Sequence, residues 1–176
     1  MRPLLRSIVL VLTLGMSAAA AEPEPLPTGL CRAARVGLEA LRVKLPMAHV
    51  TSGRRTREDE ARAWADNIAR RRRWMRLLKV ADRQELALAQ AWIDANWRTL
   101  RGRPAPIAEH LAAIFAALPD ADMARISPHF GGSAVDLRKH PRLGRRLLGG
   151  LPNVRAVLDE GDHWHVDFRC DEPLVY

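Results

Sequence analysis

A pair of adjacent glycines, Gly131 and Gly132, lies between a histidine and an aspartate in residues 127–136 (SPHFGGSAVD). These two residues, His129 and Asp136, are seven positions apart, and the glycines argue against one continuous helix between them. Glycine adopts loop conformations that other residues resist. A strand, a tight loop and a return strand would bring both side chains to one point, and we expect these strands at 124–128 and 133–137.

The end of the chain predicts a β-hairpin, with strands at Val154–Leu158 and His163–Phe168 around a turn at 159–161. Side chains alternate along a strand, so the polar and apolar residues of the second strand lie on opposite faces. The polar face carries His163, His165 and Asp167, and the apolar face carries Trp164, Val166 and Phe168. We expect the polar face to line a site and the apolar face to pack on helices.

The first two thirds of the chain are predominantly helical in pattern. Helices are expected at Leu30–Leu45, from Thr56 through the apolar pattern of 61–100, and from Pro106 or Ile107 to Leu118. Thr56 is a good N-cap with Asp59 in a weak capping box, and a break is predicted at Val80-Ala81. Met47–Ser52 is a candidate strand and Leu143–Leu148 a short helix. The tryptophans at helical spacing are interpreted as core residues.

This order of elements favours an α+β fold, in which a small antiparallel sheet carries the histidines and aspartate described above and packs against an N-terminal helical layer. Residues 1–21 have the pattern of a secretory signal peptide, with Arg2 and Arg6 before a short apolar run and alanines at 19–21. An uncleaved anchor is the alternative. Residues 22–29 form a proline-rich linker, and residues 30–176 are predicted to be one exported domain.

The chain is basic, with a formal net charge of +8 that would fall to +6 without Arg2 and Arg6. Four consecutive arginines occupy positions 70–73. A basic exported protein is attracted to anionic cell-wall polymer or membrane surface, although the arginine run fits a solvated helix face equally well. Export argues against nucleic acid as a partner.

Two cysteines, Cys31 and Cys170, lie near the two ends of the mature chain. In an oxidising compartment, they would pair and tie the N-terminal helix to the last strand. Neither cysteine has a second thiol or a histidine at ligand spacing, which argues against metal binding by this pair.

Two imidazoles and a carboxylate form a ligand set that suits zinc. His165 would join His129 and Asp136 as the third ligand, and three protein ligands leave one coordination position for water. The metal lowers the pKa of that water toward neutral and so produces a nucleophile. The alternative is a hairpin with hydrogen-bonded surface histidines and no metal. The other histidines, at positions 49, 110 and 140, have no ligand spacing.

Three motifs occur in order over residues 50–166. Residues 50–56 are V-T-S-G-R-R-T, residues 127–136 fit S-x-H-x-x-G-x-A-x-D, and residues 162–165 are D-H-W-H. Together they resemble the zinc D-Ala-D-Ala peptidases and their LAS-type relatives, a group with lysostaphin-like, D-Ala-D-Ala-cleaving and hedgehog-like domains. The first motif resembles Ser-Gly-Tyr-Arg-Ser/Thr of the D-Ala-D-Ala branch, and the last resembles Glu-x-Trp-His or His-x-His.

The resemblance implies that His129, Asp136 and His165 bind zinc. Asp162 occupies the position of the family's glutamate base, where it would deprotonate the zinc-bound water and protonate the leaving amine. Aspartate is one methylene shorter than glutamate, and Glu160, two residues earlier, is the alternative base.

The same resemblance gives roles to residues around the ligands. Arg55 would stabilise the carbonyl oxyanion or hold a substrate carboxylate, because a guanidinium is always charged and binds carboxylates in a fork. His163 would hydrogen-bond the tetrahedral intermediate or orient Asp162. Ser127 would fix the loop or hydrogen-bond a ligand, and Gly53 fits the family turn.

We therefore expect zinc-dependent hydrolysis of an amide bond in a peptidoglycan stem peptide or cross-link, by a carboxypeptidase or endopeptidase. The protein would be a periplasmic or secreted monomer with peripheral cell-wall contact. One alternative is a non-catalytic zinc-containing module that binds the cell wall or a protein. Another is an exported helical interaction domain without metal.

Overall fold

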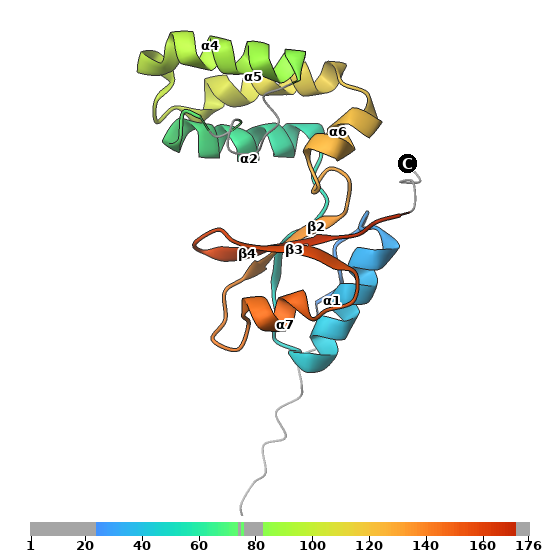
Figure 1. The fold of residues 1–176 in the computed structure, drawn as a ribbon. Helices are drawn as coiled ribbons and strands as arrows, with labels where there is room; N and C mark the ends of the chain where they lie inside the picture. Colours follow the sequence, from blue (N-terminus) through green and yellow to red (C-terminus); the bar gives the residue numbers. More distant parts are fainter. Residues whose placement is uncertain (1–23, 74, 76–82, 172–176) are drawn as a thin grey trace, which may run out of the picture.

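The computed structural model describes residues 24–73, 75 and 83–171. The predicted signal peptide, Trp74 and the predicted helix break at Val80-Ala81 lie outside these residues. The described part contains helices and one small antiparallel sheet, which confirms the α+β class (Figure 1). Within the same ranges, no helix combines the length and the apolar character needed to cross a membrane.

The sheet has the strand order β1-β2-β4-β3, and all neighbouring strands are antiparallel. Its strands are β1 (Val50–Ser52), β2 (Ala134–Arg138), β3 (Val154–Asp159) and β4 (His163–Phe168). The predicted C-terminal hairpin is therefore confirmed. The strand predicted at 47–52 is limited to its last three residues.

The two faces of β4 differ as predicted. Val166 and Phe168 belong to a buried hydrophobic cluster and Trp164 packs against it, whereas His163, His165 and Asp167 line a cavity on the other face. The strict alternation of side chains along a strand explains this separation.

The helices form two groups on opposite sides of the sheet (Figure 1). α1 (Arg32–Lys44) and α7 (Arg145–Gly149) cover the apolar face and share one core with the strands. The second group has its own core and consists of α2 (Arg57–Arg70), α4 (Gln84–Leu100), α5 (Pro104–Ala117) and α6 (Asp120–Ile126). This arrangement differs from the single N-terminal helical layer predicted from the sequence, because the second group buries its apolar side chains within itself.

Two local predictions are corrected by the structure. The strand predicted at 124–128 is wrong, because most of these residues end α6, whose first turn carries Asp120 and Asp122. Acidic side chains stabilise the positive end of a helix. α5 begins at Pro104, before the predicted start. Proline is tolerated in the first helical turn, where backbone N–H groups have no partner within the helix.

The start of α2 is capped as predicted. The Thr56 hydroxyl accepts the Asp59 N–H at 3.1 Å, and the Asp59 carboxylate accepts the Thr56 N–H at 3.4 Å. This capping box satisfies two backbone donors at the helix start. It fixes the start of α2. This helix carries Glu60 and Trp64, which both line the cavity of the candidate site.

The chain passes between the sheet and the second helical group at residues 53–56 and again at 127–133. The two crossings are joined by a hydrogen bond from the Arg55 N–H to the His129 carbonyl oxygen, at 3.3 Å. Two of the predicted site residues therefore lie where the two cores meet.

A disulfide joins Cys31 to Cys170, as predicted, with the Cα atoms 6.1 Å apart and a sequence separation of 139. The Cys31 N–H also donates to the Gly132 carbonyl at 3.0 Å, and Cys31 Sγ accepts the Ala34 N–H at the start of α1. The disulfide thus anchors the start of α1 beside the loop at 127–133.

Replacing both cysteines with serine (Cys31→Ser and Cys170→Ser) should lower the free energy of unfolding by up to about 5 kcal/mol, because a cross-link over so long a loop restricts the unfolded chain. Serine retains an N-cap at position 31, so the change isolates the cross-link. Urea unfolding of oxidised wild type, reduced wild type and the double variant measures the effect. Equal unfolding midpoints would contradict this role.

Candidate metal centre

Strand register places several site residues in one row across the sheet. Ser52 on β1 pairs with Asp136 on β2, Asp136 pairs with His165 on β4, and His165 pairs with Leu158 on β3. Directly paired residues are close neighbours on one face of a sheet. The register therefore brings Asp136 and His165 together across 29 positions of sequence.

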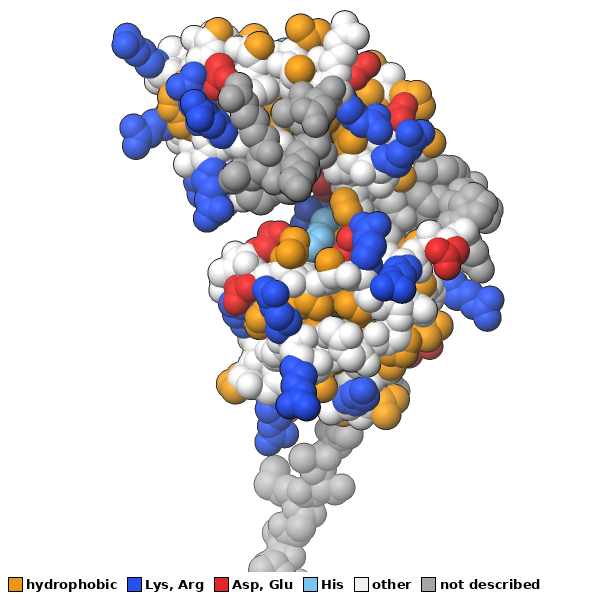
Figure 2. Space-filling model, viewed as in Figure 1, with side chains coloured by type: hydrophobic (Ala, Val, Ile, Leu, Met, Phe, Trp, Pro, Cys, Tyr) orange, Lys and Arg blue, Asp and Glu red, His pale blue; other side chains and the backbone are white. Residues whose placement is uncertain are grey.

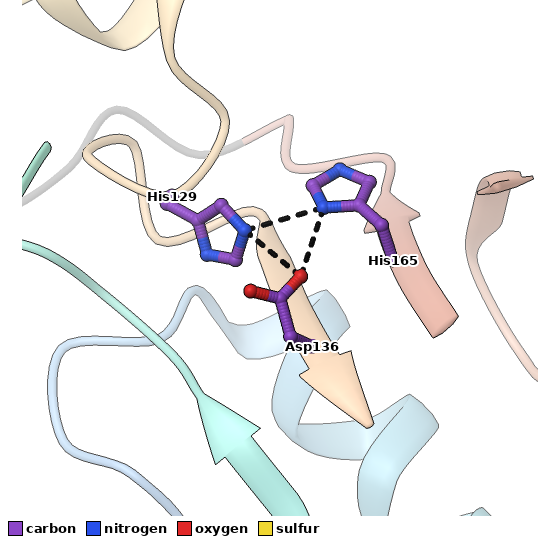
Figure 3. A group of neighbouring side chains, drawn as sticks. All are labelled: His129, Asp136 and His165. Carbon is purple, nitrogen blue, oxygen red and sulfur yellow. Dashed lines mark hydrogen bonds and ion pairs between the residues drawn. The ribbon is translucent and has the colours of Figure 1, made fainter. Parts of the chain in front are cut away.

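His129 completes a triangle with these two residues (Figure 3). Its Nε2 lies 3.2 Å from His165 Nδ1 and 3.2 Å from Asp136 Oδ1, and His165 Nδ1 lies 3.1 Å from the same oxygen. Three atoms of metal-ligating type thus converge on one point, and the group could hold a metal ion. The structure brings together all three residues predicted as ligands.

Hydrogen bonds between residues that are near in sequence hold the loop at 127–133 closed around His129. The Gly131 N–H donates to the Ser127 carbonyl at 3.0 Å, and the Phe130 N–H donates to the Ser127 hydroxyl at 3.1 Å. Ser127 is buried. Of its two predicted roles, the structure shows the first, which is to fix the loop.

The ring of His129 is oriented by a backbone carbonyl. Its Nδ1 lies 2.9 Å from the Gly53 carbonyl oxygen. Because a carbonyl oxygen can only accept, Nδ1 carries the proton in this contact, and Nε2 is the nitrogen that points to Asp136 and His165. Metal-binding histidines are commonly held in this way.

Gly132 is needed for the loop to pass close to the N-terminal segment. Its φ is +65°, and an added Cβ would lie 2.3 Å from the Gly29 carbonyl oxygen. Non-glycine residues rarely adopt this conformation, and the close approach leaves no room for a side chain. This confirms the expectation for Gly132, whereas Gly131 has no positive φ and an added Cβ there would meet its nearest neighbours at an ordinary 3.4 Å.

Arg55 fixes Asp136 from the side opposite the histidines. Its Nη2 donates to Asp136 Oδ2 at 2.7 Å, its Nε to Ser52 Oγ at 3.0 Å, and its Nη1 to Glu60 Oε2 at 3.4 Å. Glu60 is buried and also accepts the Trp64 indole N–H at 2.6 Å. One Asp136 oxygen therefore faces the histidines, while the other is paired with the guanidinium.

The surroundings of the triangle keep Asp136 ionised. Burial alone would raise the pKa of Asp136, but hydrogen bonds from His129 and His165 and the charge of Arg55 hold that pKa well below its ordinary value. Burial would lower the pKa of His165, yet its hydrogen bond to Asp136 and the charge of that carboxylate raise it. Asp136 is therefore a carboxylate, the form in which it can ligate a metal.

The triangle lines a cavity of about 330 Å³ between the sheet and the second helical group. Figure 2 shows histidine side chains in the hollow between these two parts, with acidic and hydrophobic side chains beside them. The helical wall includes Trp64, Asn67, Arg125 and Ile126, and the hairpin wall includes Leu158, Glu160 and Asp167. This volume is within the range of small-ligand sites.

The two candidate bases lie in different surroundings. The Asp162 side chain is 90% exposed and is not part of the cavity wall. The hydrogen bond from His163 Nδ1, at 2.7 Å, and the charge of that imidazole lower the pKa of Asp162. Glu160 does line the cavity, with Oε2 3.2 Å from His163 Nε2. His163 Nε2 in turn lies 3.6 Å from Asp136 Oδ1, so His163 stands between Glu160 and the triangle.

Sequence reasoning missed Glu60 as a site residue. Glu60 lies in an acidic run at the start of α2, where it resembles a solvated helix residue. The available signal was its position four residues before Trp64. Residues at this spacing are neighbours on a helix, so Glu60 could have been expected to lie beside a buried tryptophan and not in solvent.

Comparison with known proteins gives no relative: no family model matches the chain, and neither a curated protein nor a solved structure matches it significantly. The resemblance to LAS-type peptidases therefore rests on the motif residues themselves.

Removing one corner of the triangle should abolish metal binding. After zinc loading and dialysis, we expect about one ion per chain in the wild type and almost none in His129→Ala, because three protein ligands are the usual minimum for such a site. His140→Ala is the matched control, because His140 lies outside the cavity and accepts the Arg142 N–H. Elemental mass spectrometry gives the counts. Equal metal in wild type and His129→Ala, or none in either, would contradict the site.

Gly132→Ala should strain the loop that carries His129. We expect the free energy of unfolding to fall by about 1–3 kcal/mol, and metal binding to weaken. Gly144→Ala is the control, because its φ is −135° and an added Cβ there meets nothing within 4 Å. Thermal unfolding and metal titration of both variants provide the comparison. Indistinguishable behaviour of the two variants would show that the loop does not need this glycine.

Proposed function

We propose that this protein is a zinc-dependent hydrolase that cleaves an amide bond in peptidoglycan peptides, as a D-Ala-D-Ala-type carboxypeptidase or an endopeptidase. The observation that carries the proposal is the convergence of His129, Asp136 and His165 in a cavity that Glu160 also lines. The resemblance of the three ordered motifs to LAS-type metallopeptidases supports the substrate class. The disulfide and the predicted signal peptide fit a protein exported to the periplasm or beyond.

The donor set fits zinc better than the other common metals. Calcium and magnesium prefer oxygen ligands, whereas zinc readily takes two imidazoles and a carboxylate. Ligand atoms about 2.0–2.1 Å from a tetrahedral zinc lie roughly 3.3–3.4 Å apart. The edges of the triangle, 3.1–3.2 Å, are close to this spacing. When bound, zinc would supply a Lewis acid and lower the pKa of a water molecule.

Glu160 is the proton acceptor in this proposal. Its carboxylate lines the cavity, so it can take a proton from the attacking water and return it to the leaving amine. His163 contacts Asp162 through Nδ1 and Glu160 through Nε2, so it positions Glu160 beside the triangle. Arg55 neutralises Asp136 and also lines the cavity, where it can meet a substrate oxyanion or carboxylate.

A non-catalytic zinc-containing module is the second candidate. The position of Asp162 favours it, because the residue at the family's base position points into solvent. Such a module would hold zinc and bind a cell-wall polymer or a protein without turnover.

Substitution of the two acids separates these candidates. With zinc-loaded protein and a synthetic pentapeptide ending in D-Ala-D-Ala, Glu160→Gln should lower kcat by about 10²–10⁴-fold because the proton acceptor is lost. Metal content should be unchanged, since Glu160 is not a ligand. Asp162→Asn removes a carboxylate from the same hairpin and should cause a smaller loss. Product formation is followed by chromatography and mass spectrometry, with purified peptidoglycan as a second substrate.

A greater loss in Asp162→Asn than in Glu160→Gln would transfer the base role to Asp162. No hydrolysis of either substrate by zinc-loaded wild type would exclude the hydrolase and favour the binding module.

A further inference from the structure

A second acid in the cavity has an oxygen without a hydrogen-bond partner. Asp167 follows His165 on the same face of β4 and lines the same cavity. Arg155 on β3 directs both Nε, at 2.9 Å, and Nη2 to the single oxygen Oδ2. Within the described residues, Oδ1 is buried and has no partner. The side chain as a whole is 9% exposed.

This arrangement is unusual for an arginine–aspartate pair. A guanidinium commonly forks across both oxygens of a carboxylate, and buried polar atoms nearly always have partners. Here the positive charge of Arg155 balances the carboxylate while one strong acceptor stays unused. A donor that enters the cavity would therefore gain a hydrogen bond without having to neutralise a charge.

Small side chains flank Asp167 on both neighbouring strands. The cross-strand neighbours of Asp167 are Ala134 on β2 and Ala156 on β3, both of which have short side chains. The terminal torsion of an aspartate is soft, so Oδ1 can turn toward the cavity. Two residues along a strand correspond to about 6.6 Å, which is the offset of Asp167 from His165 and from the metal row.

We propose that Asp167 accepts a main-chain amide N–H of the bound peptide, about two residues from the bond that is cut. A neutral N–H fits the charge-balanced carboxylate better than an ammonium group does. An extended peptide advances about 3.3–3.6 Å per residue, so two of its residues span the same distance as the offset along β4. The inference rests on the proposed hydrolase function. It makes Asp167 a specificity-determining residue, because the substrate must then have a peptide amide at this subsite.

An ester scan of the substrate tests this contact. In the synthetic pentapeptide ending in D-Ala-D-Ala, each non-scissile amide is replaced in turn by an ester, which removes one N–H and keeps the shape of the chain. For wild type, kcat/KM should fall roughly tenfold or more at one position, because the acceptor is again left unpaired.

Two variants connect that loss to Asp167. In Asp167→Ala, the amide and ester substrates should react equally at that position. In Asp167→Asn, the donors of Arg155 hold the amide oxygen, so the NH₂ group takes the place of Oδ1 and the preference should vanish or reverse in favour of the ester. Asp162→Asn is the matched control. Its ratio of kcat/KM for the amide substrate to kcat/KM for the ester substrate should equal that of the wild type. Circular dichroism and metal content confirm folding of each variant.

A wild-type ratio near one at every position, or a ratio unchanged in both Asp167 variants, would overturn the inference. Failure of the hydrolase proposal is distinct, because zinc-loaded wild type would then cleave none of these peptides. In that case, the same amide-to-ester ratios are measured as Kd by calorimetry, and the absence of a ratio sensitive to Asp167 would again overturn the inference.

Discussion

The buried carboxylate of Asp136 holds the site together. A buried charge persists only when it is paired and hydrogen-bonded, and Asp136 divides its two oxygens between two kinds of partner. One oxygen faces His129 and His165, and the other is bound by Arg55. Through Arg55 the same network reaches Glu60 on α2. The triangle of His129, Asp136 and His165 and the junction between the two cores are therefore parts of one polar network.

The cavity exists because the second helical group has a core of its own. If those helices packed directly on the polar face of the sheet, their apolar side chains would fill the space in front of the triangle. Instead they pack on one another, and Trp64 meets Phe115 edge-on with ring centres 5.3 Å apart. The helical group thus forms a wall of the cavity, while two strands and the loop at 127–133 carry the three residues of the triangle. This division allows the shape of the cavity to change without any change in the triangle.

The local features of this structure could be predicted from the sequence because they depend on near neighbours. The alternation along β4 predicted which side chains face the cavity, and the glycine pair predicted a loop that brings His129 toward Asp136. The sequence could not decide between Glu160 and Asp162 as the candidate base. In a continuous strand the two residues would share one face, but the hairpin turn interrupts that alternation. The pairing of Arg55 with the buried carboxylate was also beyond reach. Arg55 and Asp136 are 81 positions apart, and their contact depends on the register of β1 against β2.

X-ray absorption spectroscopy of the zinc-loaded protein tests the metal centre most directly. Ligation by His129, Asp136 and His165 predicts a four-coordinate shell of nitrogen and oxygen at about 2.0 Å, with outer-shell scattering from two imidazoles and no sulfur. In His129→Ala, any remaining bound zinc should show no more than one imidazole. A six-coordinate shell of oxygen without imidazole, or a shell that contains sulfur, would contradict ligation by His129, Asp136 and His165.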